Sequence, residues 1–314
     1  MQQVNKRAKQ MSQVVQSNFA RNSSTVREQL VIQDNLRDST VWGDFAHRQT
    51  DLVITSCYRS GTTLTQQIVN LLIHGHDDFE KAYQLEEIHQ LSPWVEFTWY
   101  PTKEEKIKLI EKLPNPRFFK THLPFDAVPY YSEWKYICLF RDLRDVAMSL
   151  FNQANAYTPQ AYELFASKLN AAANFAEFWD KWLENGEPYW EPWNYINSWW
   201  KERHNPNILF VHYADLINHK PKEIEKIADF LDIKLDPSMK ETILERSSLK
   251  YMQENSDKFE PKAFQRNRFI YLGVNDRWKS LLNKEQLKKY QEITAQKLEP
   301  ECINWLENAG DLPD

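Results

Sequence analysis

One short segment combines a guanidinium, four hydroxyl groups and a glycine, the composition of an anion site. It reads Tyr-Arg-Ser-Gly-Thr-Thr over residues 58–63 and directly precedes a helical pattern. Free N–H groups at a helix N-terminus bind phosphate or sulfate, and Gly61 lets an anion approach the backbone closely. The segment lacks the lysine and spacing of a Walker A loop, which argues against an ordinary magnesium-dependent ATPase. A tight turn that exposes Arg59 to water explains the loop equally well when it is taken alone.

A second anion site is indicated at Arg141, which directly follows another apolar run. Ser149 comes about two helical turns later in the chain. Arginine is suited to phosphate because its guanidinium donates two parallel hydrogen bonds. The alternative is a surface arginine paired with Asp142 or Asp145.

Lys120 and His122 supply acid–base chemistry at the end of a third apolar run. They are two residues apart, so in an extended segment both side chains project to one side. The cation could neutralise a leaving group while a neutral imidazole takes a proton from a nucleophile. A solvent-exposed histidine beside the turn residue Pro124 is the alternative.

No metal site is predicted. His74, His76 and Asp77 have tempting spacing, but a polar helix end explains them better. The three cysteines are odd in number and have no C-x-x-C spacing, so they indicate neither disulfides nor a thiolate metal site. They suit a reducing compartment.

The elements that must position these groups alternate between strand and helix patterns. Apolar strand patterns are followed by helix patterns, which predicts parallel β-α units. The predicted strands cover residues 51–55, 117–121, 135–140 and 208–213, and the predicted helices cover 62–74, 102–113, a stretch after Asp142, and 221–231. We therefore expect a single α/β domain with a central parallel sheet flanked by helices. Ligands bind at the carboxyl ends of such strands, so the three candidate sites should lie close together.

Composition and charge exclude several classes of protein. The 314 residues are 42% hydrophobic and 26% charged, which excludes a disordered chain. A formal net charge of -5 argues against a nucleic-acid binder. No apolar run reaches the ~18 residues that a membrane helix needs, so we expect no stable membrane insertion and a cytoplasmic protein. Residues 1–40 are predicted to form a polar N-terminal arm, although its basic, acid-free first part also loosely matches an organelle transit peptide.

Aromatic residues concentrate in residues 178–200, which hold six of the twelve tryptophans. We expect most of these side chains to pack a helical layer over the sheet and a minority to line a pocket. Together with Trp94, Phe97, Trp99 and Tyr100 they favour a small apolar or aromatic ligand, because such pockets are lined by aromatic rings with a few polar groups.

In combination, these motifs resemble the cytosolic-type sulfotransferases. That family has a P-loop-NTPase-like fold and uses 3′-phosphoadenosine 5′-phosphosulfate (PAPS) as sulfuryl donor. The resemblance runs from about Asp51 to Lys279. It rests on residues 58–63, 120–124 and 141–149, on Trp199-Trp-Lys-Glu-Arg203 through Val211-His-Tyr-Ala-Asp-Leu216, and on Gly273 with Trp278-Lys279. Residues 41–314 would then form the sulfotransferase domain.

The resemblance implies a role for each matching residue. Arg59, Ser60, Gly61, Thr62 and Thr63 would hold the 5′-phosphosulfate, Arg141 and Ser149 the 3′-phosphate, and Tyr213 and Ser247 would lie near the adenine, with Gly273 in the C-terminal motif. His122 would be the general base. Lys120 and Arg59 would stabilise charge on the transferring group.

Three positions depart from the family pattern. Arg59 replaces the usual lysine, and Leu64 stands where a tryptophan often stacks on adenine. Tyr271-Leu272 replace an Arg-Lys pair that contacts the 3′-phosphate. Arg266, Arg268 or Arg277 could supply the missing charge.

The predicted function is transfer of a sulfuryl group from PAPS to a hydroxyl of a small, apolar or aromatic acceptor, without a metal. The alternatives are a P-loop small-molecule kinase, or a diverged protein that binds PAPS or its bisphosphate product (PAP) without turnover. The small acceptor is the expected partner, nucleic acid is not, and the sequence leaves room for a homodimer.

Overall fold

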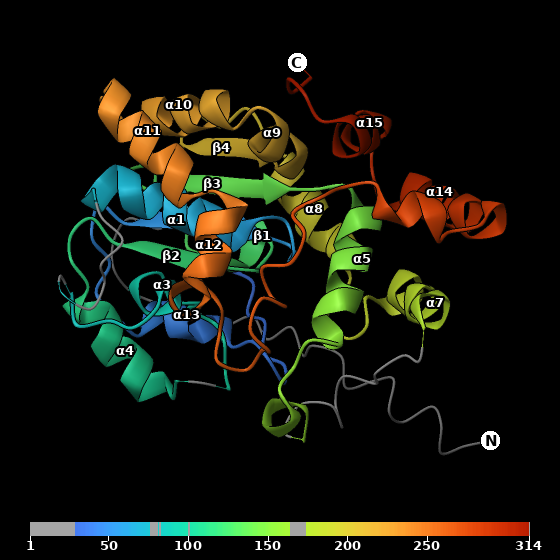
Figure 1. Ribbon diagram of the computed structural model, residues 1–314, viewed down its shortest axis with the longest axis horizontal. Helices are drawn as coiled ribbons and strands as arrows, with labels where there is room; N and C mark the ends of the chain where they lie inside the picture. The colour runs from blue at the N-terminus through green and yellow to red at the C-terminus, as the bar shows by residue number, and fades with distance from the viewer. Residues whose placement is uncertain (1–28, 76–80, 82, 100, 164–173, 314) are drawn as a thin grey trace.

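A parallel sheet of four strands lies at the centre of the computed structural model, which describes residues 29–75, 81, 83–99, 101–163 and 174–313 (Figure 1). The strands are β1 (Leu52–Ser56), β2 (Phe118–Thr121), β3 (Lys135–Phe140) and β4 (Ile208–His212), and their order in the sheet is β2-β1-β3-β4. All neighbouring strands pair in parallel. The predicted fold class and all four predicted strands are confirmed.

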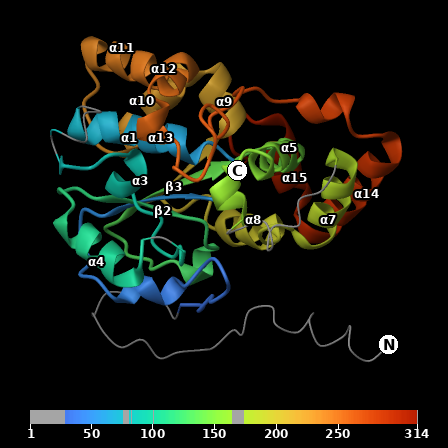
Figure 2. The ribbon, with the colours of Figure 1, turned by 60° about the horizontal axis from the view of Figure 1, so that its bottom comes forward.

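Helices cover both faces of this sheet, and its strands are accordingly rich in apolar residues. In two views α1 (Thr62–His74), α10 (Lys220–Phe230) and α11 (Pro237–Arg246) lie on one side, and α4 (Lys103–Lys112) lies on the other (Figures 1 and 2). Every residue of β1 is buried.

The other described helices are η2 (Ser39–Gly43), α3 (Ile88–Leu91), η3 (Phe125–Ala127), α5 (Leu143–Ala154), α7 (Phe175–Asn185), α8 (Pro192–Trp200), α9 (Tyr213–Asn218), α12 (Leu249–Glu254), α13 (Ser256–Phe259), η4 (Arg277–Ser280), α14 (Lys284–Lys297) and α15 (Pro300–Asn308). None of the described helices is long and apolar enough to cross a membrane.

Local signals start these helices where the sequence predicts. Thr102 and Glu105 form a complete capping box on α4, and the Asp142 side chain accepts a hydrogen bond from the Arg144 N–H to begin α5. Tyr213 is a small correction: the sequence predicts it at the end of a strand, whereas in the structure it begins α9. The His212 ring accepts a hydrogen bond from the Ala214 N–H, and this cap turns the chain into the helix.

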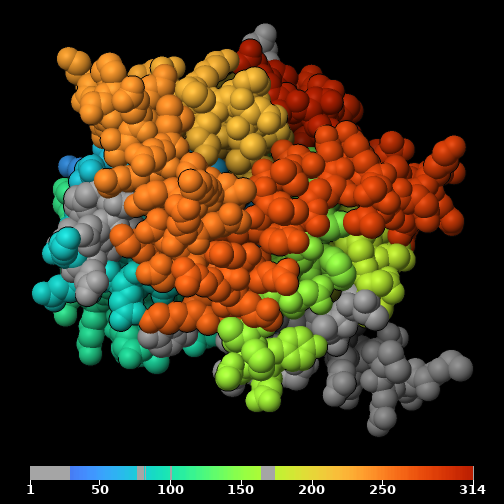
Figure 3. Space-filling view, viewed as in Figure 1, coloured from blue at the N-terminus to red at the C-terminus, as the bar shows by residue number. Residues whose placement is uncertain are grey.

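Most of the aromatic-rich segment packs into the core, as predicted. Trp179, Trp182, Trp199 and Trp200 are each at most 1% exposed. The segment that follows α13 crosses the front of the molecule, where the orange surface joins α12 and α13 to the C-terminal helices (Figure 3).

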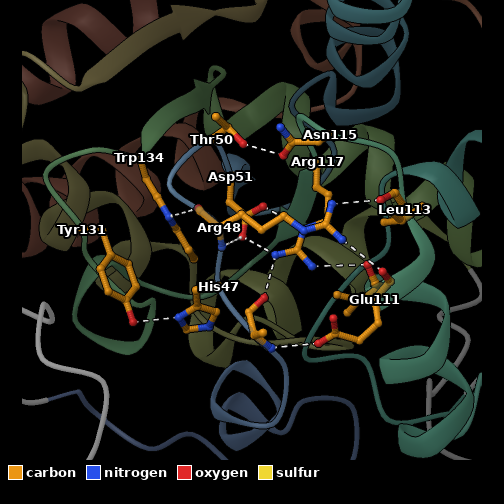
Figure 4. Close-up of polar contacts among 12 residues, drawn as sticks. His47, Arg48, Thr50, Asp51, Glu111, Leu113, Asn115, Arg117, Tyr131 and Trp134 are labelled. Atoms are coloured by element: carbon orange, nitrogen blue, oxygen red, sulfur yellow. Dashed lines mark hydrogen bonds and ion pairs between the residues drawn. The ribbon is translucent and has the colours of Figure 1, made fainter.

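The amino ends of β1 and β2 are joined by a buried polar network (Figure 4). The Arg117 guanidinium donates to both carboxylate oxygens of Asp51 at 2.8 and 2.5 Å, and both side chains are fully buried. Arg117 also donates to the carbonyls of Ala46 and Ile110. These bonds lock the two strands to the segment before β1 and to α4.

The first described residues pack against the domain. Val31 and Ile32 are buried, and the Leu30 N–H donates to the Asp126 carbonyl. Residues 36–38 pair with residues 96–98 through backbone hydrogen bonds. Residues 1–28 of the predicted arm lie outside the described residues, so its boundary at residue 40 stays a prediction.

Candidate active site

The loop between β1 and α1 forms the expected helix-start anion site. Gly61 is the N-cap of α1 with φ of 95°, a left-handed conformation that favours glycine. A Cβ there would lie 2.7 Å from the Tyr213 ring. A side chain at residue 61 would therefore be strained and would clash. The N–H groups of the first turn of α1 have no partners within the helix, so they can bind an anion.

A cavity of about 380 Å³ opens beside this loop, and we call it the donor cavity. It brings together nearly all the residues that the sequence selects. They are Arg59, Gly61, Thr62, Thr63, Lys120, His122, Arg141, Ser149, Tyr213, Ser247 and Gly273. Ser60 is the exception, because its buried hydroxyl donates to the Tyr58 carbonyl and does not line the cavity.

Two arginines converge in the donor cavity. Arg59 donates through Nε to the Ser149 hydroxyl at 3.0 Å and through Nη2 to the Phe269 carbonyl. Arg141 donates to the Arg59 carbonyl at 3.1 Å, and its guanidinium lies 4.2 Å from the centre of the Tyr213 ring. Burial lowers the pKa of Arg59 to about 10, and the charge of Arg141 adds to this shift. Arg59 thus reaches the subsite expected for Arg141 and Ser149.

A segment after α13 forms part of the cavity wall. Residues 268–274 and Arg277 line it. The guanidinium carbons of Arg268 and Arg277 lie 5.9 and 5.5 Å from the Tyr271 ring centre. Arg266 is directed elsewhere, since it donates to the Ser256 hydroxyl.

Asp145 on α5 ties this segment to the cavity floor. Its carboxylate accepts a hydrogen bond from the Asp276 N–H at 3.1 Å. Burial raises the pKa of Asp145 to about 6, and the Arg141 guanidinium opposes the shift.

His122 follows β2 and is 6% exposed. Its Nδ1 lies 2.8 Å from the Ser56 carbonyl, which can only accept, so Nδ1 carries the proton and Nε2 keeps its lone pair. Burial holds the pKa of His122 well below its usual value, and the Lys120 charge lowers it further. The imidazole is therefore neutral at pH 7, as a general base must be.

Lys120 lies in the donor cavity beside an aromatic ring. Its Nζ is 5.0 Å from the centre of the Trp94 ring. The chain around Trp94 pairs with Lys120 through the Pro93 carbonyl and the Val95 N–H. Burial lowers the pKa of Lys120 to about 8, while Glu96 raises it and Arg59 lowers it.

Glu96 is a site residue that sequence reasoning missed. One oxygen of its fully buried carboxylate accepts hydrogen bonds from the His122 N–H at 2.7 Å, the Thr121 hydroxyl at 3.0 Å and the Trp94 indole at 2.6 Å. Glu96 therefore fixes the segment that carries Lys120 and His122. No local pattern marks it, because the two partners that tie it to the site, Thr121 and His122, are 25 and 26 positions away in the sequence.

A second cavity, of about 550 Å³, is also lined by His122, and we call it the acceptor cavity. Tyr189, Trp190 and His122 line both cavities. The turn that carries Trp190 depends on Gly186, since a Cβ there would lie 2.1 Å from the Trp190 backbone. Trp99 and Trp193 also line the acceptor cavity, whereas Tyr100 lies outside the described residues.

Within the described part of the chain, no group of three or more His, Cys, Asp or Glu side chains could hold a metal ion. His76 and Asp77 of the His74–Asp77 motif lie outside it. The three cysteines are buried and free.

The fold and cavities define an α/β protein with a helix-start anion site at the carboxyl ends of its strands. The sulfotransferase domain family matches residues 49–300. Rat sulfotransferase 1A1 is 30% identical over 70% of this chain and 70% of its own length, and mouse sulfotransferase 1B1 is 28% identical over 81% and 85%. A solved structure of retinol dehydratase with retinol and PAP is 25% identical, covers 87% of this chain and 88% of that one, and superposes with a TM-score of 0.67.

The chain belongs to the sulfotransferase domain family. It is a sulfotransferase, of the class of enzymes that transfer a sulfuryl group from PAPS to an acceptor hydroxyl.

Proposed function

We propose that His122 takes the proton of an acceptor hydroxyl while the donor cavity holds PAPS. The observation that carries this proposal is that the same neutral imidazole lines both cavities. Its Nδ1 proton is held by the Ser56 carbonyl, which leaves Nε2 as the basic atom. A general base needs a free lone pair within reach of the hydroxyl that reacts.

The residues of the donor cavity fit a bisphosphorylated nucleoside. The start of α1 suits the 5′-phosphosulfate, with Thr62 and Thr63 beside it. Ser247 lines the cavity with a buried hydroxyl that has no described partner, as expected of a group that waits for a ligand. Tyr213 presents an aromatic ring between Gly61 and Arg141.

We assign the 3′-phosphate to Arg141 and Ser149, with Arg268 and Arg277 replacing the absent Arg-Lys pair. Both of these arginines line the donor cavity, whereas Arg266 is held by Ser256. Arginine can donate two parallel hydrogen bonds to a phosphate, so either position can restore the lost contacts.

The reaction forms a bond between the acceptor oxygen and sulfur and breaks the bond between sulfur and the bridging phosphate oxygen. His122 Nε2 receives the hydroxyl proton. Lys120 stabilises the negative charge that builds on the sulfuryl and phosphate oxygens. Arg59 can take part in this only when its guanidinium turns away from the Ser149 hydroxyl, to which it donates in this structure. The acceptor itself lies in the acceptor cavity with its apolar part on aromatic rings such as Trp190 and Trp193.

The test is transfer of radiolabelled sulfuryl from PAPS to a panel of phenols and alcohols in excess EDTA. We expect labelled sulfate esters and equal rates with and without the chelator. PAP binding without any labelled ester would favour a diverged binding protein. Magnesium-dependent transfer from ATP to the same panel would favour a kinase. Either result would contradict the proposal.

We also propose that the chain works in the cytoplasm. Its three cysteines are buried and unpaired, and burial raises the pKa of Cys57 to about 12, so its thiol stays protonated. A homodimer stays a prediction.

A further inference from the structure

A charged pair lies in the wall of the acceptor cavity, where the sequence predicts apolar or aromatic lining. Arg37 and Asp34 both line this cavity, and Arg37 is only 8% exposed. Removing a guanidinium from water is costly unless it is paired and hydrogen-bonded. The pair is therefore a specific feature of this wall that needs a reason.

The hydrogen bonds of the pair leave only donors for a ligand. Asp34 Oδ1 accepts from the N–H groups of Leu36 and Arg37, and Oδ2 accepts from Arg37 Nε and Nη2. These bonds use the accepting capacity of the carboxylate. No described residue accepts a hydrogen bond from Arg37 Nη1, so its N–H groups remain available to the cavity.

The guanidinium is held in place rather than swinging freely. Its central carbon lies 3.8 Å from the centre of the Trp190 ring. The Trp190 backbone is fixed in turn, because its carbonyl accepts a hydrogen bond from the Tyr58 hydroxyl at 3.0 Å. Residue 37 also pairs through its backbone with Phe97. A donor fixed in this way recognises a ligand group at a defined position.

Trp190 links this donor to the reacting histidine. The ring centres of Trp190 and His122 are 6.2 Å apart. The Arg37 guanidinium lies 3.8 Å from the centre of the same Trp190 ring. Its distance from the imidazole therefore cannot exceed the sum of these two distances. A molecule of a few fused rings can reach from one group to the other.

We propose that the acceptor is a hydroxylated ring compound whose far end carries a carboxylate or a carbonyl that Arg37 binds. The inference rests on the proposed function, since it takes His122 as the point where the hydroxyl reacts. The apolar body of the acceptor lies along the aromatic lining of the cavity. An acceptor with a hydroxyl and nothing but hydrocarbon beyond it covers the Nη1 N–H groups of Arg37 without accepting a hydrogen bond from them, so such an acceptor is used less well.

The experiment compares three acceptors of one shape, 2-naphthol, 6-hydroxy-2-naphthoate and its methyl ester. Initial rates of radiolabelled sulfuryl transfer from PAPS give kcat/KM for each. We expect the carboxylate to exceed 2-naphthol by at least about tenfold, because a hydrogen bond to a charged group is worth that much. The kcat/KM of the methyl ester, compared with that of the carboxylate, shows whether the preferred group is a neutral carbonyl or an anion.

Arg37→Met and Arg37→Lys test the assignment of the donor. We expect Arg37→Met to reduce the preference for the carboxylate to near one and Arg37→Lys to keep part of it. Calorimetric Kd values for PAP report whether each variant is folded, since Arg37 does not line the donor cavity. If Arg37→Met binds PAP normally and keeps the full preference, the inference is wrong.

The wild-type results separate failure of the inference from failure of the proposed function. Labelled product from all three naphthols at equal kcat/KM, or a preference for 2-naphthol, overturns only the inference. No labelled product from any acceptor overturns the proposed function. In that case calorimetry of 6-hydroxy-2-naphthoate with the PAP complex still decides, because binding that Arg37→Met weakens about tenfold supports the inference and unchanged binding overturns it.

Discussion

Strands β1 and β2 carry polar side chains at both ends, and the two ends differ in how these groups are bonded. At the amino end, Arg117 and Asp51 are fully buried and bonded to each other at 2.5 to 2.8 Å (Figure 4). At the carboxyl end, Lys120 faces an aromatic ring instead of a carboxylate, and His122 keeps its Nε2 lone pair.

The contrast distinguishes charged residues that stabilise the fold, Arg117 and Asp51, from a charged residue that is available to a ligand, Lys120. A fully buried ion pair, whose guanidinium makes four hydrogen bonds within the protein, leaves little for another molecule to bind. A buried lysine and a neutral histidine beside a cavity are costly groups that a bound anion and an acceptor hydroxyl would satisfy. Two basic residues only three positions apart, Arg117 just before β2 and Lys120 within it, therefore have different roles.

The largest expected effect is on catalysis at the carboxyl end. His122→Ala should lower kcat by roughly 10²–10⁴, because it removes the general base. The free energy of unfolding of His122→Ala, measured in urea, should change far less than that of Arg117→Met at the amino end of β2. Turnover near the wild-type rate would show that another group takes the proton.

The next effect is on stability at the amino end. Arg117→Met leaves Asp51 as a buried, unpaired carboxylate, so we expect the free energy of unfolding to fall by about 3–5 kcal/mol. Urea denaturation followed by tryptophan fluorescence measures this change. Adding Asp51→Asn removes the orphaned charge and should recover part of the loss. A single variant as stable as the wild type would contradict the structural role of the pair.

A smaller effect concerns pH. His122 acts as a neutral base, so kcat/KM falls as the pH drops through its pKa, which burial and the Lys120 charge hold well below the usual value. Lys120→Met removes the repulsion and raises this pKa, so the acid limb should move to higher pH. Lys103→Met, an exposed lysine paired with Asp44, is the control and should leave the limb in place. An unmoved limb in Lys120→Met would mean that the limb does not report His122.

Much of the fold could be predicted because its signals are local. Strands covered on both faces are rich in apolar residues, and caps such as Thr102 with Glu105 lie within one helical turn. The site follows from the same topology, since parallel strands bring Arg59, Lys120 and Arg141 to one edge of the sheet.

The residues that escaped prediction act through contacts between distant segments. Glu96 supports His122 across 26 positions, and Arg59 reaches Ser149 across 90. The acceptor cavity joins residues 30–37 to residues 185–197, so Arg37 lies in a segment that the sequence marks only as a polar arm. Local propensity and periodicity carry no information on such pairings. The sequence also does not reveal that the Ser60 hydroxyl donates to the Tyr58 carbonyl, because this hydrogen bond depends on the folded turn.

The most direct test compares two arginines by one measurement, calorimetric titration of PAP. Arg141 lines the donor cavity at the carboxyl end of β3, whereas Arg117 is sealed in the amino-end network. We expect Arg141→Met to weaken PAP binding by at least about tenfold, since it removes a charge-assisted phosphate contact. Arg117→Met, measured under conditions where it is folded, should bind PAP like the wild type. Equal loss of affinity in both variants, or none in Arg141→Met, would contradict the division between the two ends of the sheet.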